Sequence, residues 1–145
     1  MIITREQIIN EALEWKGTKW QHQAALKGVA CDCAGLIRGV YRNITGIDVP
    51  INVDYPATWH LFKGVELCYQ TTQKYLDEIP LSDIQAGDVV LFAYRNRFVA
   101  HHMGIVLPDG KFIHADMDAG VVHVSPFDDV WIKRLRYAFK FRGVV

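Results

Sequence analysis

The sequence predicts an α+β domain in which helices come first and an antiparallel sheet follows. Before Pro80, apolar residues recur at the spacing of a helix face, whereas short runs after it are rich in β-branched and aromatic residues. Separate blocks of helices and strands are typical of the α+β class. The 145 residues contain no repeat, low-complexity tract or linker, so we expect one domain over 1–145.

The first predicted helix runs from about Arg5 to Trp15. Thr4 and Gln7 have the spacing of a capping box, and the apolar residues that follow mark one helix face: Ile8, Ile9, Ala12 and Leu13. Gly17 is expected to end it.

A second helix is predicted to begin at Cys33, within the stretch GVACDCAGLIRGVYRNI at 28–44. Asp32 precedes it and is expected to cap it by accepting backbone N–H groups. The positive end of a helix dipole stabilises a thiolate over a thiol. The sequence therefore predicts a lowered pKa for Cys33 and a nucleophilic role.

The segment 57–76 has helical composition but carries Gly64, Thr71 and Thr72, so we expect one or two short helices, with Pro56 at the start. Beyond it, four runs predict antiparallel strands: AGDVVLFAY, HMGIVL, KFIHA and GVVHVS. The turn 108–110 should join the second and third runs as a hairpin. The run RLRYAFKFRGVV is expected to be a closing strand.

Alternation along HMGIVL places His102 and Gly104 on the same face. Gly104 has no side chain, which predicts close approach of another element beside His102, for example the cysteine helix. His114, on the neighbouring strand, is expected to lie lateral to His102. A thiol at a helix end, a base on a facing strand and an orienting group on the next strand form the arrangement of thiol hydrolases. His101 competes for the base role, but alternation favours His102.

Net charge, cysteine content and hydropathy argue against several classes of protein. Sixteen basic residues balance sixteen acidic ones, which removes the electrostatic case for a nucleic-acid partner. The three cysteines do not form a disulfide framework. No apolar run has the length of a membrane span. The start MIITREQIINEALEW lacks a signal-peptide pattern, so we expect synthesis in the cytoplasm without a signal peptide.

Four motifs in order, DCAGL, GDVVLF, HMGIVL and FIHA, resemble the NlpC/P60 family of papain-like cysteine peptidases, which cut bacterial cell-wall peptides. The resemblance covers about 17–115. The segment 21–42 looks most similar to compact single-domain members found among phage tail and phage-like particle genes. The resemblance implies a papain-like fold with the cysteine helix packed on the antiparallel sheet.

Carried over residue by residue, the resemblance implies that Cys33 is the nucleophile, His102 the general base and His114 the residue that orients His102. It implies hydrolysis of peptidoglycan stem peptides between γ-linked D-glutamate and a diamino acid, through an acyl-enzyme and without a metal or cofactor.

The resemblance also implies which residues contact the substrate. Asp32 borders the substrate there, and Trp20 or Gln21 falls where many members have a tyrosine. This chain departs from the pattern by reading KWQHQ at that place, and by having Ala34 where many members have a serine.

Other hypotheses belong to different classes. One is a metal-binding module using four ligands: Cys31, Cys33, His102 and His114. Its C-x-C spacing differs from ordinary zinc sites. Others are a non-catalytic cell-wall or phage-tail binding domain, and an amidase or acyltransferase on the same fold. Expected partners are a peptidoglycan peptide and proteins of a phage tail or phage-like particle, with a virion-associated location or delivery to the cell wall.

Overall fold

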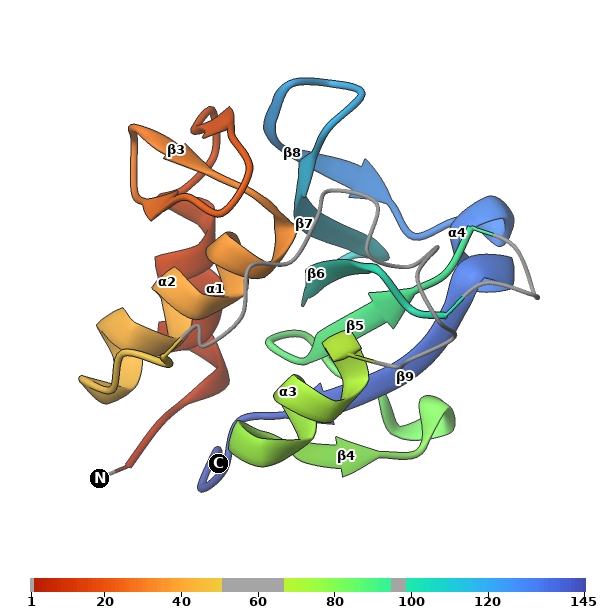
Figure 1. Ribbon diagram of the computed structural model, residues 1–145. Helices are drawn as coiled ribbons and strands as arrows, with labels where there is room; N and C mark the ends of the chain where they lie inside the picture. The colour runs from red at the N-terminus through yellow and green to blue at the C-terminus, as the bar shows by residue number, and fades with distance from the viewer. Residues whose placement is uncertain (1, 51–66, 95–98) are drawn as a thin grey trace.

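The computed structural model describes residues 2–50, 67–94 and 99–145 (Figure 1). Its helices are α1 (Arg5–Leu13), α2 (Cys33–Thr45), α3 (Leu67–Tyr75) and α4 (Asp129–Arg134), with a 3-10 turn at Leu81–Asp83. Its strands are β1 (Lys19–Trp20), β2 (Ala25–Leu26), β3 (Ala30–Cys31), β4 (Asp77–Ile79), β5 (Val89–Phe92), β6 (His102–Leu107), β7 (Lys111–Asp116), β8 (Val121–Pro126) and β9 (Leu135–Lys140). None of these helices is long and apolar enough to cross a bilayer.

Within these residues, nine strands form one sheet in the order β2-β3-β1-β8-β7-β6-β5-β9-β4. Neighbouring strands are antiparallel, except that β1 and β3 run parallel. Figure 1 shows α1 and α2 packed together beside the sheet, with α3 near β4 and β9. The two ends of the chain meet, because Ile3 forms a parallel bridge with Val144. The α+β prediction is confirmed.

The structure confirms both predicted N-terminal helices. Thr4 and Gln7 form the expected capping box of α1, and Asp32 caps α2. Gly46, in the left-handed region at φ 78°, ends α2. In the hairpin turn between β6 and β7, Asp109 and Gly110 also have positive φ. The predicted start of a helix at Pro56 lies outside the described residues.

The sheet separates two apolar clusters. On one face of β6, Met103, Ile105 and Leu107 pack in the same cluster as Leu36 and Val40 of α2. On the opposite face, a smaller cluster contains Val90, Phe92, Val106, Phe112 and Ala138, with Trp131 of α4 packed against it. The alternation predicted for β6 is therefore confirmed, and His102 belongs to the face opposite α2.

The predicted close approach at Gly104 is confirmed, but the element that approaches is not the cysteine helix given as an example. A Cβ at Gly104 would lie 2.9 Å from the Phe112 ring and 3.1 Å from the Ile113 carbonyl oxygen. The close approach therefore comes from β7. Because α2 packs on the Met103 face, it cannot be the element that Gly104 accommodates.

The GDVVLF motif has a structural role. Asp88 is fully buried, and one carboxylate oxygen accepts a hydrogen bond of 2.6 Å from the Arg5 guanidinium of α1. Its other oxygen accepts from the Gln85 backbone N–H at 2.8 Å. Gly87, at φ 94°, makes the turn that places Asp88 there. The motif thus joins the first helix to the start of β5.

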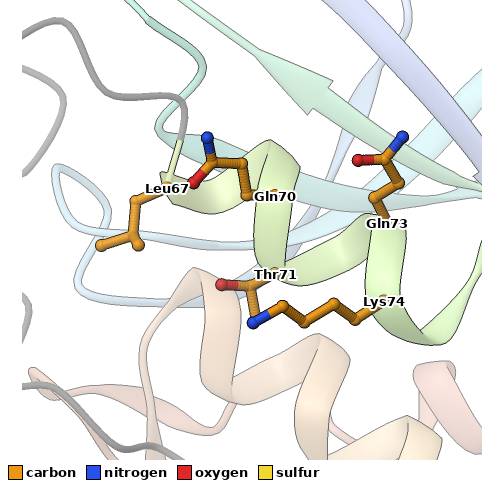
Figure 2. A pocket seen from close by; sticks show the side chains of 5 residues that line it. All are labelled: Leu67, Gln70, Thr71, Gln73 and Lys74. Carbon is orange, nitrogen blue, oxygen red and sulfur yellow. The ribbon is translucent and has the colours of Figure 1, made fainter.

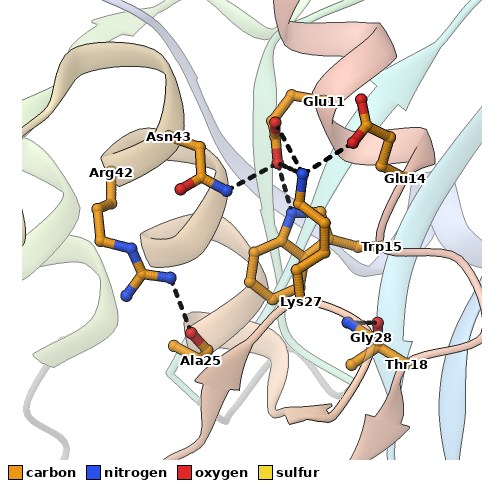
Figure 3. A network of polar contacts seen from close by, with 9 residues as sticks. All are labelled: Glu11, Glu14, Trp15, Thr18, Ala25, Lys27, Gly28, Arg42 and Asn43. Atoms are coloured by element: carbon orange, nitrogen blue, oxygen red, sulfur yellow. Dashed lines mark hydrogen bonds and ion pairs between the residues drawn. The ribbon is translucent and has the colours of Figure 1, made fainter.

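A polar network fixes the segment that precedes α2 (Figure 3). Lys27 donates to Glu11 of α1 at 3.1 Å and to Glu14, the C-cap of that helix, at 2.9 Å. Glu11 also accepts from Trp15 and from Asn43 of α2. One carboxylate therefore connects α1, α2 and the loop between β2 and β3, which holds the approach to Cys33 in place.

Candidate active site

Cys33 is the first residue of α2, and Asp32 fixes its surroundings. One carboxylate oxygen of Asp32 accepts from the Gly35 N–H at 2.7 Å, and the other accepts from the Gln23 N–H at 2.7 Å. A Cβ at Gly35 would lie 1.8 Å from the Ala24 carbonyl oxygen. The glycine of DCAGL therefore allows the loop before β2 to lie directly on the first turn of α2.

The sulfur of Cys33 lies against the backbone that flanks His102. It is 3.6 Å from the His101 carbonyl oxygen, to which the thiol donates. Cys33 is half-buried, whereas Cys31 and Cys68 are buried and behave as core residues. Among the three cysteines, Cys33 is therefore the one that a reagent or substrate can reach.

The predicted lowering of the Cys33 pKa is wrong. Burial, and after it the charge of Asp32, raise the pKa of the thiol to about 12. Hydrogen bonding to the Met103 and Ala34 backbone lowers the pKa, as expected near a helix N-terminus, but this effect is smaller. The resting protein therefore holds Cys33 as a neutral thiol.

His102 and His114 meet at the open end of the β6–β7 hairpin. The ladder between these strands ends at the pair Ile105 and Ile113, so the two histidines lie beyond the last paired residues. There, His102 Nε2 is 2.7 Å from His114 Nδ1. The predicted lateral contact is confirmed, and His102 rather than His101 makes it.

Ser125 of β8 continues this chain of hydrogen bonds. Its Oγ lies 2.8 Å from His114 Nε2, and its side chain is buried. If Ser125 accepts a hydrogen bond from His114, then His114 carries its proton on Nε2 and presents the lone pair of Nδ1 to His102. His102 then carries its proton on Nε2 and has a free lone pair on Nδ1. Sequence reasoning missed Ser125, because no local pattern distinguishes it.

Both histidines are held neutral. Burial, and after it the neighbouring His114, lower the pKa of His102 well below its ordinary value. Burial likewise lowers the pKa of His114 to about 4, against a raising effect of Asp116. A neutral imidazole can act as a general base toward a thiol that attacks a substrate.

The described residues contain one group with the composition of a metal site: His114, Asp116 and His123, whose ligand atoms lie within 4.8 Å of one another. His123 lies directly across from His114 and stacks on its ring at 4.8 Å. Both ring nitrogens of His114 already have partners, so a metal here would have to displace His102 or Ser125. The cysteines of the metal-module hypothesis are not part of this group.

Aromatic rings enclose His102. Tyr94, just after β5, and Trp131 of α4 have ring centroids 6.0 Å and 5.8 Å from that of His102. Burial, and after it the charges of Asp116 and Cys33, raise the pKa of Tyr94 to about 12. Neither ring was predicted to lie near His102, because no local pattern indicates these contacts.

Two of the predicted substrate residues lie next to β3, the strand that leads into α2. Trp20 is half-buried and pairs with Cys31 in the β1–β3 ladder. The backbone N–H of Gln21 donates to the Cys31 carbonyl at 3.1 Å. Their contact with a substrate stays a prediction, as does that of Asp32. His22 lies 4.0 Å from the Asp32 carboxylate, and His60 lies outside the described residues.

A hollow of about 500 Å³ lies against α3, away from the residues described above (Figure 2). Its lining consists of Leu67, Gln70, Thr71, Gln73 and Lys74. This set has no nucleophile paired with a base, so the candidate site remains the one at the start of α2.

Two similar proteins are named as peptidases. Murein DD-endopeptidase MepS/Murein LD-carboxypeptidase of Escherichia coli K12 is 25% identical over 134 residues, which are 92% of this chain and 61% of the relative. Gamma-D-glutamyl-L-lysine dipeptidyl-peptidase of Bacillus subtilis is 26% identical over 113 residues, covering 77% of this chain and 32% of the relative. The chain thus spans less than two thirds of the length of these relatives.

Solved structures share the fold. An NlpC/P60 family protein from Bacillus cereus superimposes with a TM-score of 0.71 at 18% identity, over 97% of this chain and 41% of that one. The NlpC/p60 domain of the peptidoglycan hydrolase SagA gives 0.64 at 22% identity, over 96% and 100%. The predicted NlpC-type papain-like fold is confirmed. The NlpC/P60 family model itself matches residues 12–140, so this chain belongs to the NlpC/P60 family.

Proposed function

We propose that this chain is a cysteine endopeptidase that hydrolyses peptidoglycan stem peptides with Cys33, His102 and His114. The observation that supports the proposal is that α2, β6 and β7 meet, since these elements carry Cys33, His102 and His114. The Cys33 thiol lies against the backbone beside His102, and His102 is bonded to His114 at 2.7 Å. Relatives named as murein endopeptidases support the substrate class.

The reaction starts from a neutral thiol and a neutral imidazole. The thiol leaves its hydrogen bond to the His101 carbonyl and turns to His102, which takes its proton as the sulfur attacks the amide carbonyl. The carbon–nitrogen bond then breaks, and His102 gives the proton to the departing amine. Water, deprotonated by His102, cleaves the thioester and restores the thiol.

His114 keeps His102 in the productive tautomer. Its Nδ1 accepts the His102 Nε2 proton, and this leaves Nδ1 of His102 free to act as the base. When His102 becomes positively charged during attack, the same hydrogen bond is strengthened by the charge. His114 therefore orients the base and does not itself exchange protons with substrate.

The bond that is cut is proposed to be the one between γ-linked D-glutamate and a diamino acid. The relative from Bacillus subtilis is named for γ-D-glutamyl-L-lysine, whereas the relative from Escherichia coli is named as a DD-endopeptidase and LD-carboxypeptidase. Digestion of purified peptidoglycan, followed by mass analysis of the fragments, distinguishes these bonds, because each leaves a different terminal residue.

Cys33→Ala tests the nucleophile. We expect it to abolish release of peptide fragments while the circular dichroism spectrum and the melting temperature stay close to those of the starting protein. Ala34→Ser, which changes the next residue to the serine of many relatives, is the matched control and should remain active. Full activity in Cys33→Ala would remove the assignment.

Delivery by a phage tail or phage-like particle remains part of the proposal. It rests on the resemblance of the segment 21–42 to phage-type members. Detection of the chain by mass spectrometry in purified particles would support it, and its absence from particles made by a producing strain would count against it.

A further inference from the structure

Arg134, the last residue of α4, has an unusual environment for a cation. Its guanidinium carbon lies 4.7 Å from the centroid of the Tyr94 ring and 4.7 Å from that of Trp131. Arg134 is half-buried, and within the described part of the chain its guanidinium has no carboxylate partner. The two rings therefore hold the cation while its N–H donors remain available.

The same two rings border the proposed base. Trp131 lies 5.8 Å and Tyr94 6.0 Å from the His102 ring. Tyr94 also contacts the ring of His101, at 4.6 Å, whose carbonyl accepts from the Cys33 thiol. The guanidinium and the imidazole of His102 thus share two aromatic neighbours.

The chemistry of a guanidinium limits what can bind there. The two ring centroids are only 6.1 Å apart, with the rings at 72° to each other, so they cover adjoining sides of the guanidinium and leave the N–H donors at its edge to meet a ligand. The edge carries parallel N–H donors that fit a carboxylate through two hydrogen bonds. Stacking fixes the orientation of that edge, which reduces the entropy lost on binding.

We propose that Arg134, held by Tyr94 and Trp131, binds a free carboxylate of the substrate peptide next to the scissile amide. The inference rests on the proposed function, and it names the chemical class that the site selects. In a stem peptide cut after γ-linked D-glutamate, this group is the α-carboxylate of that glutamate. Peptides in which it is amidated, as in D-isoglutamine, should be poor substrates.

The charge of Arg134 also affects the protonation of His102. Burial and the neighbouring histidines, followed by Arg134, lower the pKa of His102. A carboxylate bound to Arg134 offsets its positive charge and removes part of the opposition to a protonated His102. The acidic substrate would therefore assist the proton transfer that its own cleavage requires.

Two peptides that differ in one group test the inference: L-Ala-γ-D-Glu-L-Lys and its α-carboxamide counterpart. We expect the protein to prefer the acid by about 10- to 100-fold in kcat/KM, the range of a charge-assisted hydrogen-bonded pair. Arg134→Gln should lose this preference, mainly through a higher KM for the acid. Arg134→Lys should retain part of it, because the charge remains and the paired donors do not.

Lys133→Gln is the matched control, since it removes an equal charge from an exposed neighbour on the same helix. It should keep the preference. Binding of both peptides to the Cys33→Ala protein, measured by calorimetry, separates this inference from the proposed function. If neither peptide is cut but the acid binds more tightly in an Arg134-dependent manner, the function fails and the inference stands. An acid-to-amide ratio unchanged by Arg134→Gln, in cleavage or in binding, would overturn the inference.

Discussion

His102 Nε2 lies 2.7 Å from His114 Nδ1, at the point where β6 and β7 are no longer paired through their backbones. In the register of this ladder the next residue opposite His114 would be Gly104, so the hydrogen bond joins two histidines that are diagonal to each other. Because each ring carries a single proton when neutral, the direction of this bond follows from whether the partner at the outer end of the chain accepts or donates a hydrogen bond. That partner is Ser125.

Ser125→Ala should therefore reduce kcat while the protein stays folded. Without the hydroxyl, His114 loses the acceptor for its Nε2 proton, and the tautomer that leaves His102 free as the base is less favoured. We expect a loss of about tenfold, below the roughly 10²–10⁴-fold of complete general acid–base catalysis. Nitrogen chemical shifts of the labelled histidines should report the tautomer change, and Ser125→Thr should preserve both signals. Unchanged shifts in Ser125→Ala would contradict the relay.

Alkylation of Cys33 by iodoacetamide should become steadily faster as the pH rises from 6 to 10. With a pKa of about 12, the thiolate fraction is small at neutral pH and increases about tenfold per pH unit. Cys33 should still react before Cys31 and Cys68, because those two are 0% and 2% exposed. Peptide mass mapping gives the rate at each site, with Cys33→Ala as the control. A rate that is already constant above pH 6 would indicate a preformed thiolate.

The free energy of unfolding should fall as the pH drops from about 6.5 to 4. The pKa of His114 is about 4 in the folded protein, against 6.5 for an unperturbed histidine, and that of His102 is also lowered. In this window the unfolded chain binds protons that the folded protein does not. Each histidine then contributes a slope of about 1.4 kcal/mol per pH unit. Urea titrations at pH 7, 6 and 5 measure the slope.

The variant His114→Asn is the control for that measurement. It removes one of the two imidazoles whose lowered pKa is described above, so its stability should depend less steeply on pH in the same window. Equal slopes in the two proteins would show that His114 does not resist protonation in the folded state.

Gly35→Ala should destabilise the protein and reduce its activity. The added methyl group would lie 1.8 Å from the Ala24 carbonyl oxygen, so the loop or the first turn of α2 must shift. Overpacking of this kind costs about 1–3 kcal/mol. Ala34→Ser, one residue earlier, adds an atom without this contact and should leave the denaturation midpoint close to its starting value. A Gly35→Ala protein that unfolds at the same urea concentration would show that the loop yields freely.

The elements that could be predicted were those with a clear period or an end signal. The capping box of α1, the apolar face of α2 and the β-branched runs of β5 to β8 each extend over enough residues to show a pattern. The two-residue strands β1, β2 and β3 do not, and their pairing depends on tertiary contacts. The six residues of α4 are likewise too few for a helical period.

The site residues that belong to sequence motifs could be predicted. Those brought to the site only by the folding of the sheet and of α4 could not. Cys33, His102 and His114 stood out through their spacing and their resemblance to a family. Ser125 and Arg134 acquire their positions from the register of β8 and from the end of α4, which no local signal reveals. The sign of the Cys33 pKa shift was missed for a related reason, because burial by distant residues exceeds the local effect of the helix end.

Asp32 uses both carboxylate oxygens, one on the Gln23 N–H and one on the Gly35 N–H. The loop that contains Gln23 and the first turn of α2 are therefore held together by this side chain. Any motion of the loop would either carry the first residue of α2, Cys33, with it or break a 2.7 Å bond to a buried acid. The position of the loop and the position of the sulfur are thus coupled through one side chain.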